Sequence, residues 1–261
     1  IKIPLFFSSM IFLVWLAWTT ESNLFKWSVY LALGYLWMSM VTFMHDATHN
    51  TLIENPWKNW VFGIVSMIPL MASFISFKDD HMEHHRYNRS PKDPDAFTMG
   101  KRGIFDFVAF YGYIVAGALL SFVHFNFIYP IQRFNVRKWA IHLFETLLKI
   151  ACYWALLAWA QKHGVLGKTL EVWLVPVCIF SVFNSIRFIA EHYETPWNQG
   201  QLVGSRTVTS NPLHSFFWNN INCHIGHHIY PTVPWYNLIE LHDLMKPAIA
   251  AEGAIVENSY T

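Results

Sequence analysis

The chain has 261 residues, of which 54% are hydrophobic, 18% aromatic and only 13% charged. Soluble domains usually carry about a quarter charged residues, so this chain has too few charges to cover a water-facing surface and a membrane is the expected solvent. The formal net charge is +1, and no basic stripe with interleaved aromatic residues occurs. The sequence therefore argues against a soluble protein and against nucleic-acid binding.

Six apolar stretches follow one another, each close to the roughly 20 residues that a spanning helix needs. Four of them are expected to cross the membrane, at about 3–20, 24–44, 142–160 and 170–190. The stretches at about 59–77 and 104–129 are expected to lie at the interface or to re-enter. The reason is the side of the membrane on which the histidines would lie. His45 follows the stretch at 24–44 and His81 follows the stretch at 59–77, so a single crossing by 59–77 would place these two residues on opposite sides. Six crossings without a shared site is the alternative.

The distribution of Lys and Arg predicts the orientation. Region 45–141 holds ten of them, whereas the loops at 21–26 and 161–169 hold three together. Positive residues favour the cytoplasmic side, so the histidines and the polar tail at 193–261 are expected there. We therefore expect one all-α integral membrane domain over 1–261, with about four spanning helices, interfacial helices and a cytoplasmic histidine-rich cap. A bacterial inner membrane is favoured, and the endoplasmic reticulum is the alternative.

Eight of the fourteen histidines fall into three short boxes, HDATH, HMEHH and HIGHH. Spacings of three and four residues place side chains on one face of a helix, so one turn can present two or three imidazoles to one point. Neutral imidazole is the commonest metal ligand in proteins. A lone histidine in an apolar chain is usually a packed core residue, but three boxes at helical spacing are not explained that way. The predicted ligands are His45, His49, His81, His84, His85, His224, His227 and His228.

The number and type of ligands suggest which metal is bound. Eight imidazoles exceed the four ligands that zinc normally takes, so two ions with four or five ligands each fit the count. A dinuclear zinc hydrolase would normally include carboxylate ligands, and HDATH is not the HExxH pattern of zinc peptidases. Copper sites usually recruit sulfur, and Met and Cys are not placed near the boxes in any regular way, with Cys223 beside His224 as the exception. Two iron ions in an all-nitrogen environment are therefore the predicted cofactors.

The three boxes resemble the HxxxH, HxxHH and HxxHH boxes of the integral-membrane fatty acid desaturase and hydroxylase superfamily. The segment HHIYPTVPWYNL, His227 to Leu238, also resembles the sequence that follows the third box in that superfamily. The similarity covers about 24–245. It implies a non-haem di-iron oxidoreductase that uses O2 and two electrons to attack an unactivated C–H bond. It also implies a ninth ligand between the second and third boxes, for which the segment RFIAEH supplies His192.

The resemblance makes desaturation of an acyl chain of a lipid or fatty acid the expected reaction. Hydroxylation or ketolation of a carotenoid, an alkane or another apolar substrate on the same kind of site is the alternative. Members with a fused cytochrome b5 carry an HPGG motif that this sequence lacks. Electrons are therefore expected from a separate partner such as ferredoxin, rubredoxin or cytochrome b5.

Polar residues near the end of the last apolar stretch are further candidates for the site. Glu191 would accept a proton from a ligand imidazole, and Arg187, one turn earlier, would balance its charge. The alternative is that Arg187 and Glu191 lie at a helix end and extend their charged groups to the aqueous interface, without a role in the site. Asn184 would contact a metal-bound water or a neighbouring helix. Weaker candidates to support ligands are Asp46, Asp80, Glu83 and Asn220, whereas Asp93 and Asp95 are expected to shape a turn.

Two other classes of protein remain open on the sequence alone. A membrane cytochrome would ligate haem through paired histidines inside facing helices, and a metal transporter would carry histidines within its spanning segments. The boxes here lie at the ends of apolar stretches and in polar segments, which favours neither. The histidines without partners at ligand spacing are expected to be structural, and they are His124, His142, His163, His214 and His242.

Overall fold

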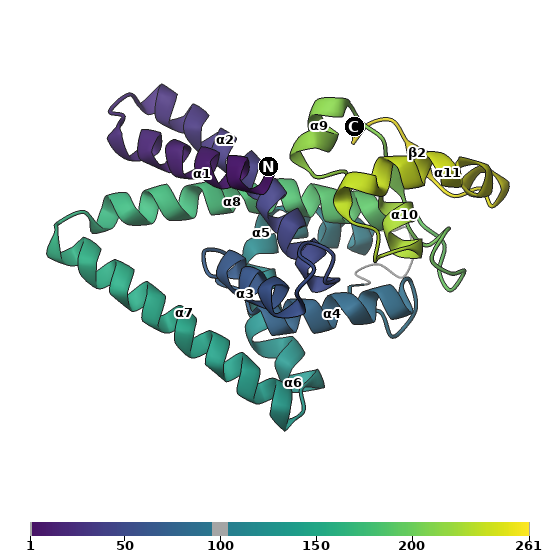
Figure 1. Ribbon diagram of the computed structural model, residues 1–261, viewed down its shortest axis with the longest axis horizontal. Helices are drawn as coiled ribbons and strands as arrows, with labels where there is room; N and C mark the ends of the chain where they lie inside the picture. Colours follow the sequence, from purple (N-terminus) through teal and green to yellow (C-terminus); the bar gives the residue numbers. More distant parts are fainter. Residues whose placement is uncertain (1, 96–103, 261) are drawn as a thin grey trace.

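The computed structural model describes residues 2–95 and 104–260, and helices dominate it (Figure 1). The longer helices, in chain order, are α1 (Lys2–Thr19), α2 (Asn23–Thr48), α3 (Pro56–Met67), α4 (Phe74–Tyr87), α5 (Ile104–Val123), α7 (Val136–Lys162), α8 (Leu166–His192) and α11 (Leu238–Ala251). The short elements are the π-helix η1 (His124–Ile128), α6 (Tyr129–Arg133), β1 (Thr207–Val208), α9 (Pro212–Phe217), α10 (His224–Ile229), the 3₁₀ helix η2 (Trp235–Asn237) and β2 (Val256–Glu257).

Two helical hairpins form the apolar part of the molecule. Helices α1 and α2 make the first, α7 and α8 make the second, and α2 packs along α8 (Figure 1). A Cβ atom at Gly34 would lie 2.5 Å from the side chain of Ile179, so the missing side chain lets α2 and α8 cross closely. Small residues at crossings of this kind are typical of membrane helices.

Five segments of the described chain are long and apolar enough to span a membrane. Four of them are α1, α2, α7 and α8, which match the four stretches expected to cross. The chain is thus an all-α membrane protein, as the sequence predicts. Large apolar side chains such as Leu24, Val115 and Trp154 are 74% or more exposed, which is unfavourable in water but not against lipid.

The fifth candidate, Tyr111–Arg133, overlaps the stretch that was expected at the interface. Its length and composition would allow a crossing. However, the Nε2 atom of His124 lies 2.9 Å from a carboxylate oxygen of Asp80 on α4, and Lys138 at the start of α7 bonds to Asp79 at 2.7 Å. The chain thus leaves α4 and returns to it, a course that suits an interfacial segment. The number of crossings stays a prediction.

The apolar stretch at 59–77 does not form a single helix. Helix α3 ends at Met67, a turn follows, and α4 begins at Phe74. The twelve residues of α3 extend about 18 Å, well short of the roughly 30 Å of hydrocarbon in a bilayer. The hydrophobic pattern alone does not show this break. Ser73 is the N-cap of α4, and its side chain accepts a hydrogen bond from the backbone N–H of Ser76.

Helix α7 fixes the start of α4. The carboxylate of Glu145 accepts hydrogen bonds from the Ser73 hydroxyl at 2.9 Å and from the backbone N–H of Ile75 at 3.2 Å. An acceptor at a helix N-terminus satisfies donors that have no partner within the helix, and its charge suits the helix dipole. Helix α4, which carries the second histidine box, is therefore anchored at its apolar end.

The tail after α8 packs across the ends of α2 and α8. The side-chain amide of Asn219 donates to the Ser39 carbonyl at 2.9 Å, and the backbone N–H of Trp235 donates to Asp46 at 3.0 Å. Strands β1 and β2 pair in parallel and join the end of the described chain to this cap. The tail thus brings the third box onto the first and second boxes.

Candidate metal centre

The nine predicted ligands come from the ends of three helices and from one face of α4. His45 lies in the last turn of α2, and His49 is its C-cap residue. His192 is the last residue of α8. The second box lies on α4 and the third on α10, so both present histidines at helical spacing. None of these nine side chains is exposed, although the six of the second and third boxes belong to polar segments.

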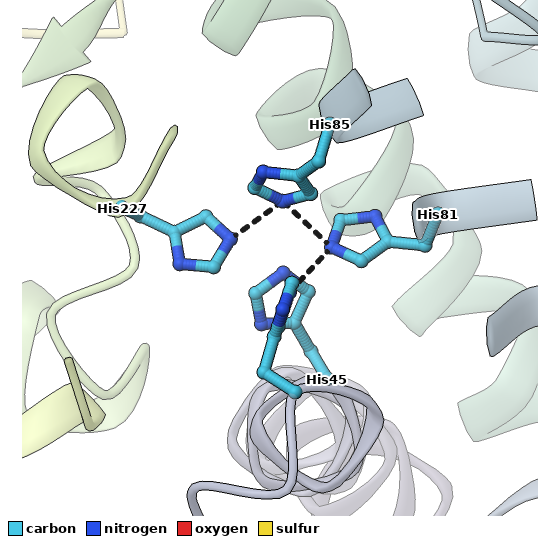
Figure 2. Close-up of side chains that lie close together, drawn as sticks. His45, His81, His85 and His227 are labelled. Carbon is cyan, nitrogen blue, oxygen red and sulfur yellow. Dashed lines mark hydrogen bonds between the residues drawn. The ribbon is translucent and has the colours of Figure 1, made fainter. Parts of the chain in front are cut away.

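Five of the rings converge on one point, and we call them the five-histidine cluster: His45, His49, His81, His85 and His227. One nitrogen of each lies within 4.8 Å of the others. The Nε2–Nε2 distance is 3.1 Å between His81 and His85 and 3.0 Å between His85 and His227. Figure 2 shows four of these rings pointing toward one another from α2, α4 and α10.

The other four rings form the four-histidine cluster: His84, His192, His224 and His228. The Nε2 atom of His192 lies 3.2 Å from the Nε2 atoms of both His84 and His224. The Nε2 atom of His228 lies 3.0 Å from that of His224. The two clusters adjoin, since the rings of His85 and His228 stack with centroids 4.4 Å apart.

Both clusters fit a metal ion. Metal–nitrogen bonds of about 2.1 Å place neighbouring ligands about 3 Å apart, as these Nε2 atoms are. Neutral imidazoles alone cannot satisfy such an arrangement, because each has one donor and one acceptor and several lone pairs would face one another. Both ring nitrogens of His45 are buried without a hydrogen-bond partner. A cation between the rings would use all the lone pairs at once.

Three rings of the four-histidine cluster are oriented by a hydrogen bond at Nδ1. His84 Nδ1 donates to Asp93 at 2.9 Å, and His192 Nδ1 donates to the Gly204 carbonyl at 3.0 Å. His228 Nδ1 donates to the side-chain carbonyl of Gln201 at 3.0 Å. A proton held at Nδ1 leaves the Nε2 lone pair free and pointing inward, which is how metal-binding histidines are commonly held.

Burial keeps most rings neutral. Burial lowers the pKa of His49 to about 3 and lowers the pKa values of His81 and His227 well below the usual range. His84 is different, because burial lowers its pKa but the hydrogen bond to Asp93 and the charges of Asp95 and Asp93 raise it overall. Neutral rings are the form that binds metal, so burial prepares the site.

Arg187 and Glu191 form a buried ion pair one helical turn apart, as their spacing predicts. The Glu191 carboxylate lies 3.5 Å from Nδ1 of His224, the one ring of the four-histidine cluster whose Nδ1 makes no hydrogen bond. The Asn184 side-chain carbonyl accepts a hydrogen bond of 3.5 Å from Arg187, within its own helix. Glu191 thus lies beside both Arg187 and the ring of His224.

Several weaker candidates have other partners. Asp80 bonds to His124, and Glu83 lies 3.8 Å from Arg133. Asp46 accepts from the Trp235 backbone and also lies 3.7 Å from Nδ1 of His45. The prediction that Asn220 orients His224 is wrong, since its amide donates to the Trp235 carbonyl at 2.9 Å. Among the described residues, the five histidines expected to be structural lie outside both clusters.

Sequence reasoning missed two supports and underrated a third. Asp93 shapes a turn by accepting from the backbone of Arg89 and Asp95, as predicted, but it also holds His84. Gln201 and Gly204 lie in the loop after α8. Gln201 accepts a hydrogen bond from His228 on α10, and the Gly204 carbonyl accepts one from His192 on α8. No spacing rule connects a loop amide to a helix that lies 27 residues later.

A cavity of about 80 Å³ lies against both clusters. Its walls include rings from each cluster, the polar side chains of Thr42, Asn184 and Arg187, and the apolar rings of Phe77 and Phe125. We call it the metal-side cavity. It could admit a small molecule or a short part of a chain to the point where the imidazoles converge.

Comparison with known proteins identifies relatives of the chain. A family model described as fatty acid desaturase matches residues 22–259. The chain is 26% identical over 230 residues to the chloroplastic omega-6 fatty acid desaturase of Arabidopsis thaliana, covering 77% of this chain and 49% of the relative. It is 24% identical over 217 residues to the sn-1 oleoyl-lipid 12-desaturase of Arthrospira platensis, covering 74% and 60%.

A third relative is the dihydrorhizobitoxine desaturase of Bradyrhizobium elkanii, 26% identical over 236 residues, covering 80% of this chain and 64% of the relative. The aligned regions thus span about half to two thirds of the length of these relatives. All three are desaturases by name, although the molecules they act on differ.

Proposed function

Since the chain belongs to the fatty acid desaturase family, we propose that it is a membrane oxidoreductase that desaturates an acyl chain of a lipid or fatty acid. The observation that supports this most is the convergence of nine imidazoles, seven of them buried and two half-buried, in two adjoining clusters beside a cavity. We propose that each cluster holds one iron ion. Two iron ions at such a site would supply O2 activation strong enough to take a hydrogen atom from an unactivated methylene.

The overall reaction removes two hydrogens from the chain and forms a carbon–carbon double bond. With two further electrons and two protons, O2 is reduced to two molecules of water. The electrons would come from a separate carrier, for which ferredoxin, rubredoxin and cytochrome b5 are the candidates. We propose that the site faces the cytoplasm, because the region that carries it is the one rich in Lys and Arg.

The protein's own groups would orient the metal ligands, exclude water from the site and compensate the charge beside it. The hydrogen bonds at Nδ1 of His84, His192 and His228 keep the Nε2 lone pairs directed at the metals. The burial of both clusters excludes water, which protects a reactive oxidant from side reactions. Glu191 and Arg187 keep a compensated charge beside His224.

The walls of the metal-side cavity would hold the reacting methylene. Phe77 and Phe125 offer apolar surface to a chain, whereas the amide of Asn184 faces the same space and is placed to bond a water or an oxygen species there. Placement of the methylene decides how fast hydrogen is removed, because a well-oriented reactant has a large advantage over a free one.

Product analysis tests the proposed function. The chain would be expressed in a host with a compatible electron carrier, and its lipids would be hydrolysed and analysed by mass spectrometry for new double bonds. The matched control is His85→Ala, which removes one imidazole of the five-histidine cluster and should give no new product. A new hydroxylated or oxo product in place of the double bond would favour the alternative reaction, and no oxidised lipid at all would contradict the proposal.

A further inference from the structure

A second cavity continues from the metal-side cavity into the apolar part of the protein. It has a volume of about 100 Å³ and lies between α2, α5, α8 and the turn that joins α3 to α4. We call it the inner cavity. The two cavities share six wall residues and therefore adjoin: Val41, Phe77, Tyr113, Ser121, Phe125 and Asn184. Together they form a channel that begins at the imidazoles.

Beyond the shared residues, the inner cavity is mostly apolar. Its walls include Met67, Leu70, Val177 and Phe180, with the hydroxyls of Ser181 and Ser185 as the polar groups. A polar head group placed among these side chains would lose its hydrogen bonds to water without replacement, at a cost of several kcal/mol. An acyl chain would therefore enter with its methyl end first and leave its head group on the other side of the metals.

The turn at 68–71 contributes Leu70 and Met71 to the wall of the inner cavity and is held from three sides. The Tyr153 hydroxyl on α7 donates to the Ile68 carbonyl at 2.5 Å, and the Trp173 indole on α8 donates to the Pro69 carbonyl at 2.8 Å. The amide of Asn126 donates to the Met71 carbonyl at 2.9 Å. Three hydrogen bonds from three different elements make this turn a fixed part of the wall.

A third cavity lies behind the wall. It has a volume of about 430 Å³, is lined almost wholly by apolar side chains and includes Ile68, Pro69 and Pro176 in its own walls. We call it the outer cavity. Since Met67 and Leu70 line the inner cavity while the two residues between them line the outer one, the cavities lie back to back across the turn.

Two aromatic rings complete the wall between the inner and outer cavities. Phe180 on α8 lines the inner cavity, and Trp37 on α2 lines the outer one. Their ring centroids are 6.5 Å apart. Phe180 is the ring that the end of an entering chain would meet, and Trp37 supports it from behind.

We propose that Phe180, backed by Trp37, stops the methyl end of the acyl chain and so sets how many carbons fit beyond the metals. This inference rests on the proposed function, because it assigns the wall a role in choosing acyl chains by length. Space for additional methylenes exists directly behind the ring, in the outer cavity. Shortening residue 180 should therefore admit longer chains, and enlarging it should exclude chains that the native protein accepts.

Turnover of a series of saturated acyl substrates that differ in length tests the proposal. Phe180→Ala should raise turnover of the first chain that the native protein rejects by about 10- to 200-fold, the range for one methylene in an apolar pocket. Phe180→Trp should shorten the longest accepted chain. Phe183→Ala is the matched control, because Phe183 lies on the same helix and packs on Tyr35 rather than on either cavity. Native length profiles in both Phe180 variants would overturn the proposal.

A second experiment reads the position of the chain without requiring turnover. A long-chain fatty acid that carries a diazirine on its terminal carbon would be bound to the purified protein and photolysed. Labels are expected in the native protein at residues 67–72 and 177–181, and Phe180→Ala should move them toward the outer cavity at 152–159. If the protein converts no substrate but labels in this way, the proposed function fails while the channel assignment stands. Labels in the outer cavity or in the tail of the native protein would overturn the inference.

Discussion

The two histidine clusters differ in what holds their rings. In the four-histidine cluster, His84, His192 and His228 each donate a hydrogen bond from Nδ1 to a group outside the cluster. In the five-histidine cluster, His45 has no hydrogen-bond partner at either nitrogen and His85 has none at Nδ1. The first cluster is therefore positioned by polar contacts, and the second mainly by the helices that carry it.

Packing takes the place of hydrogen bonds in the five-histidine cluster. The ring of His81 stacks on Phe77 with an interplanar angle of 7°. Helix α4, which carries it, is anchored by Glu145 at one end. The comparison teaches that the five-histidine cluster depends mainly on helix placement, whereas the four-histidine cluster depends on a few polar residues in loops. Substitutions of loop residues should therefore affect one metal more than the other.

The largest effect is expected when a ring of the five-histidine cluster is removed. His227→Ala should lower turnover more than about 100-fold, beyond the loss typical of a residue that only supports a ligand. It should also lower the iron content of the purified protein while leaving the protein in the membrane. Activity and iron content would be measured on the same preparation. Full activity in this variant would contradict the ligand assignment.

A smaller effect is expected from the polar supports of the other cluster. Asp93→Asn removes the charge that accepts from His84, and Gln201→Ala removes the acceptor for His228. Each should lower iron affinity or turnover by about 10- to 100-fold. The control is Asp243→Asn, which breaks an exposed ion pair with Lys246 on α11, outside both clusters. Iron bound to the five-histidine cluster should be retained, and loss of both irons would show that the clusters are not supported separately.

The pH dependence of the metal-free protein should sharpen the comparison. Burial lowers the pKa values of His85, His224 and His228, so the unfolded chain, with histidines near 6.5, binds more protons than the folded one at acidic pH. Stability should therefore fall as the pH drops below about 6.5. His84 and Asp80 oppose this trend, because the pKa of His84 is raised and burial raises the pKa of Asp80 to about 8, so the folded protein holds these protons more tightly than the unfolded chain.

Thermal unfolding in detergent would measure this dependence. Between pH 7 and pH 5 the midpoint should fall by about 4 °C or more. Asp93→Asn removes the opposing contribution of His84 and should steepen the fall. A midpoint that rises on acidification would mean that the buried rings are already protonated in the folded protein.

The smallest effect is expected outside both clusters. His163 caps the end of α7 on the far side of the hairpin and belongs to neither cluster. His163→Ala should leave iron content and turnover unchanged within error. A loss of iron in this variant would show that the set of nine ligands is incomplete.

The parts of this site that the sequence predicts are the local ones. The boxes, and the pairing of Arg187 with Glu191, follow from helical spacing alone. The division of nine rings into five and four does not, because it depends on how four separate elements meet. Gln201 could not be predicted, since its contacts join a loop to α4 and α10 across long stretches of chain.

The same distinction holds for the fold. Apolar length predicts α1, α2, α7 and α8, because a spanning helix needs a long hydrophobic run. It does not by itself reveal the turn between α3 and α4, which is marked instead by Pro69 within the apolar run and by the cap at Ser73. Nor does it decide the course of Tyr111–Arg133, since an interfacial helix and a spanning one can have the same composition.

The measurement that tests the central claim most directly is the metal content of the detergent-purified protein by mass spectrometry after iron-supplemented growth. Two clusters that each hold one ion predict about two irons per chain, and about one in His227→Ala. One metal or none per native chain under these conditions would contradict the claim, because the three boxes and His192 would then not assemble into a dinuclear centre.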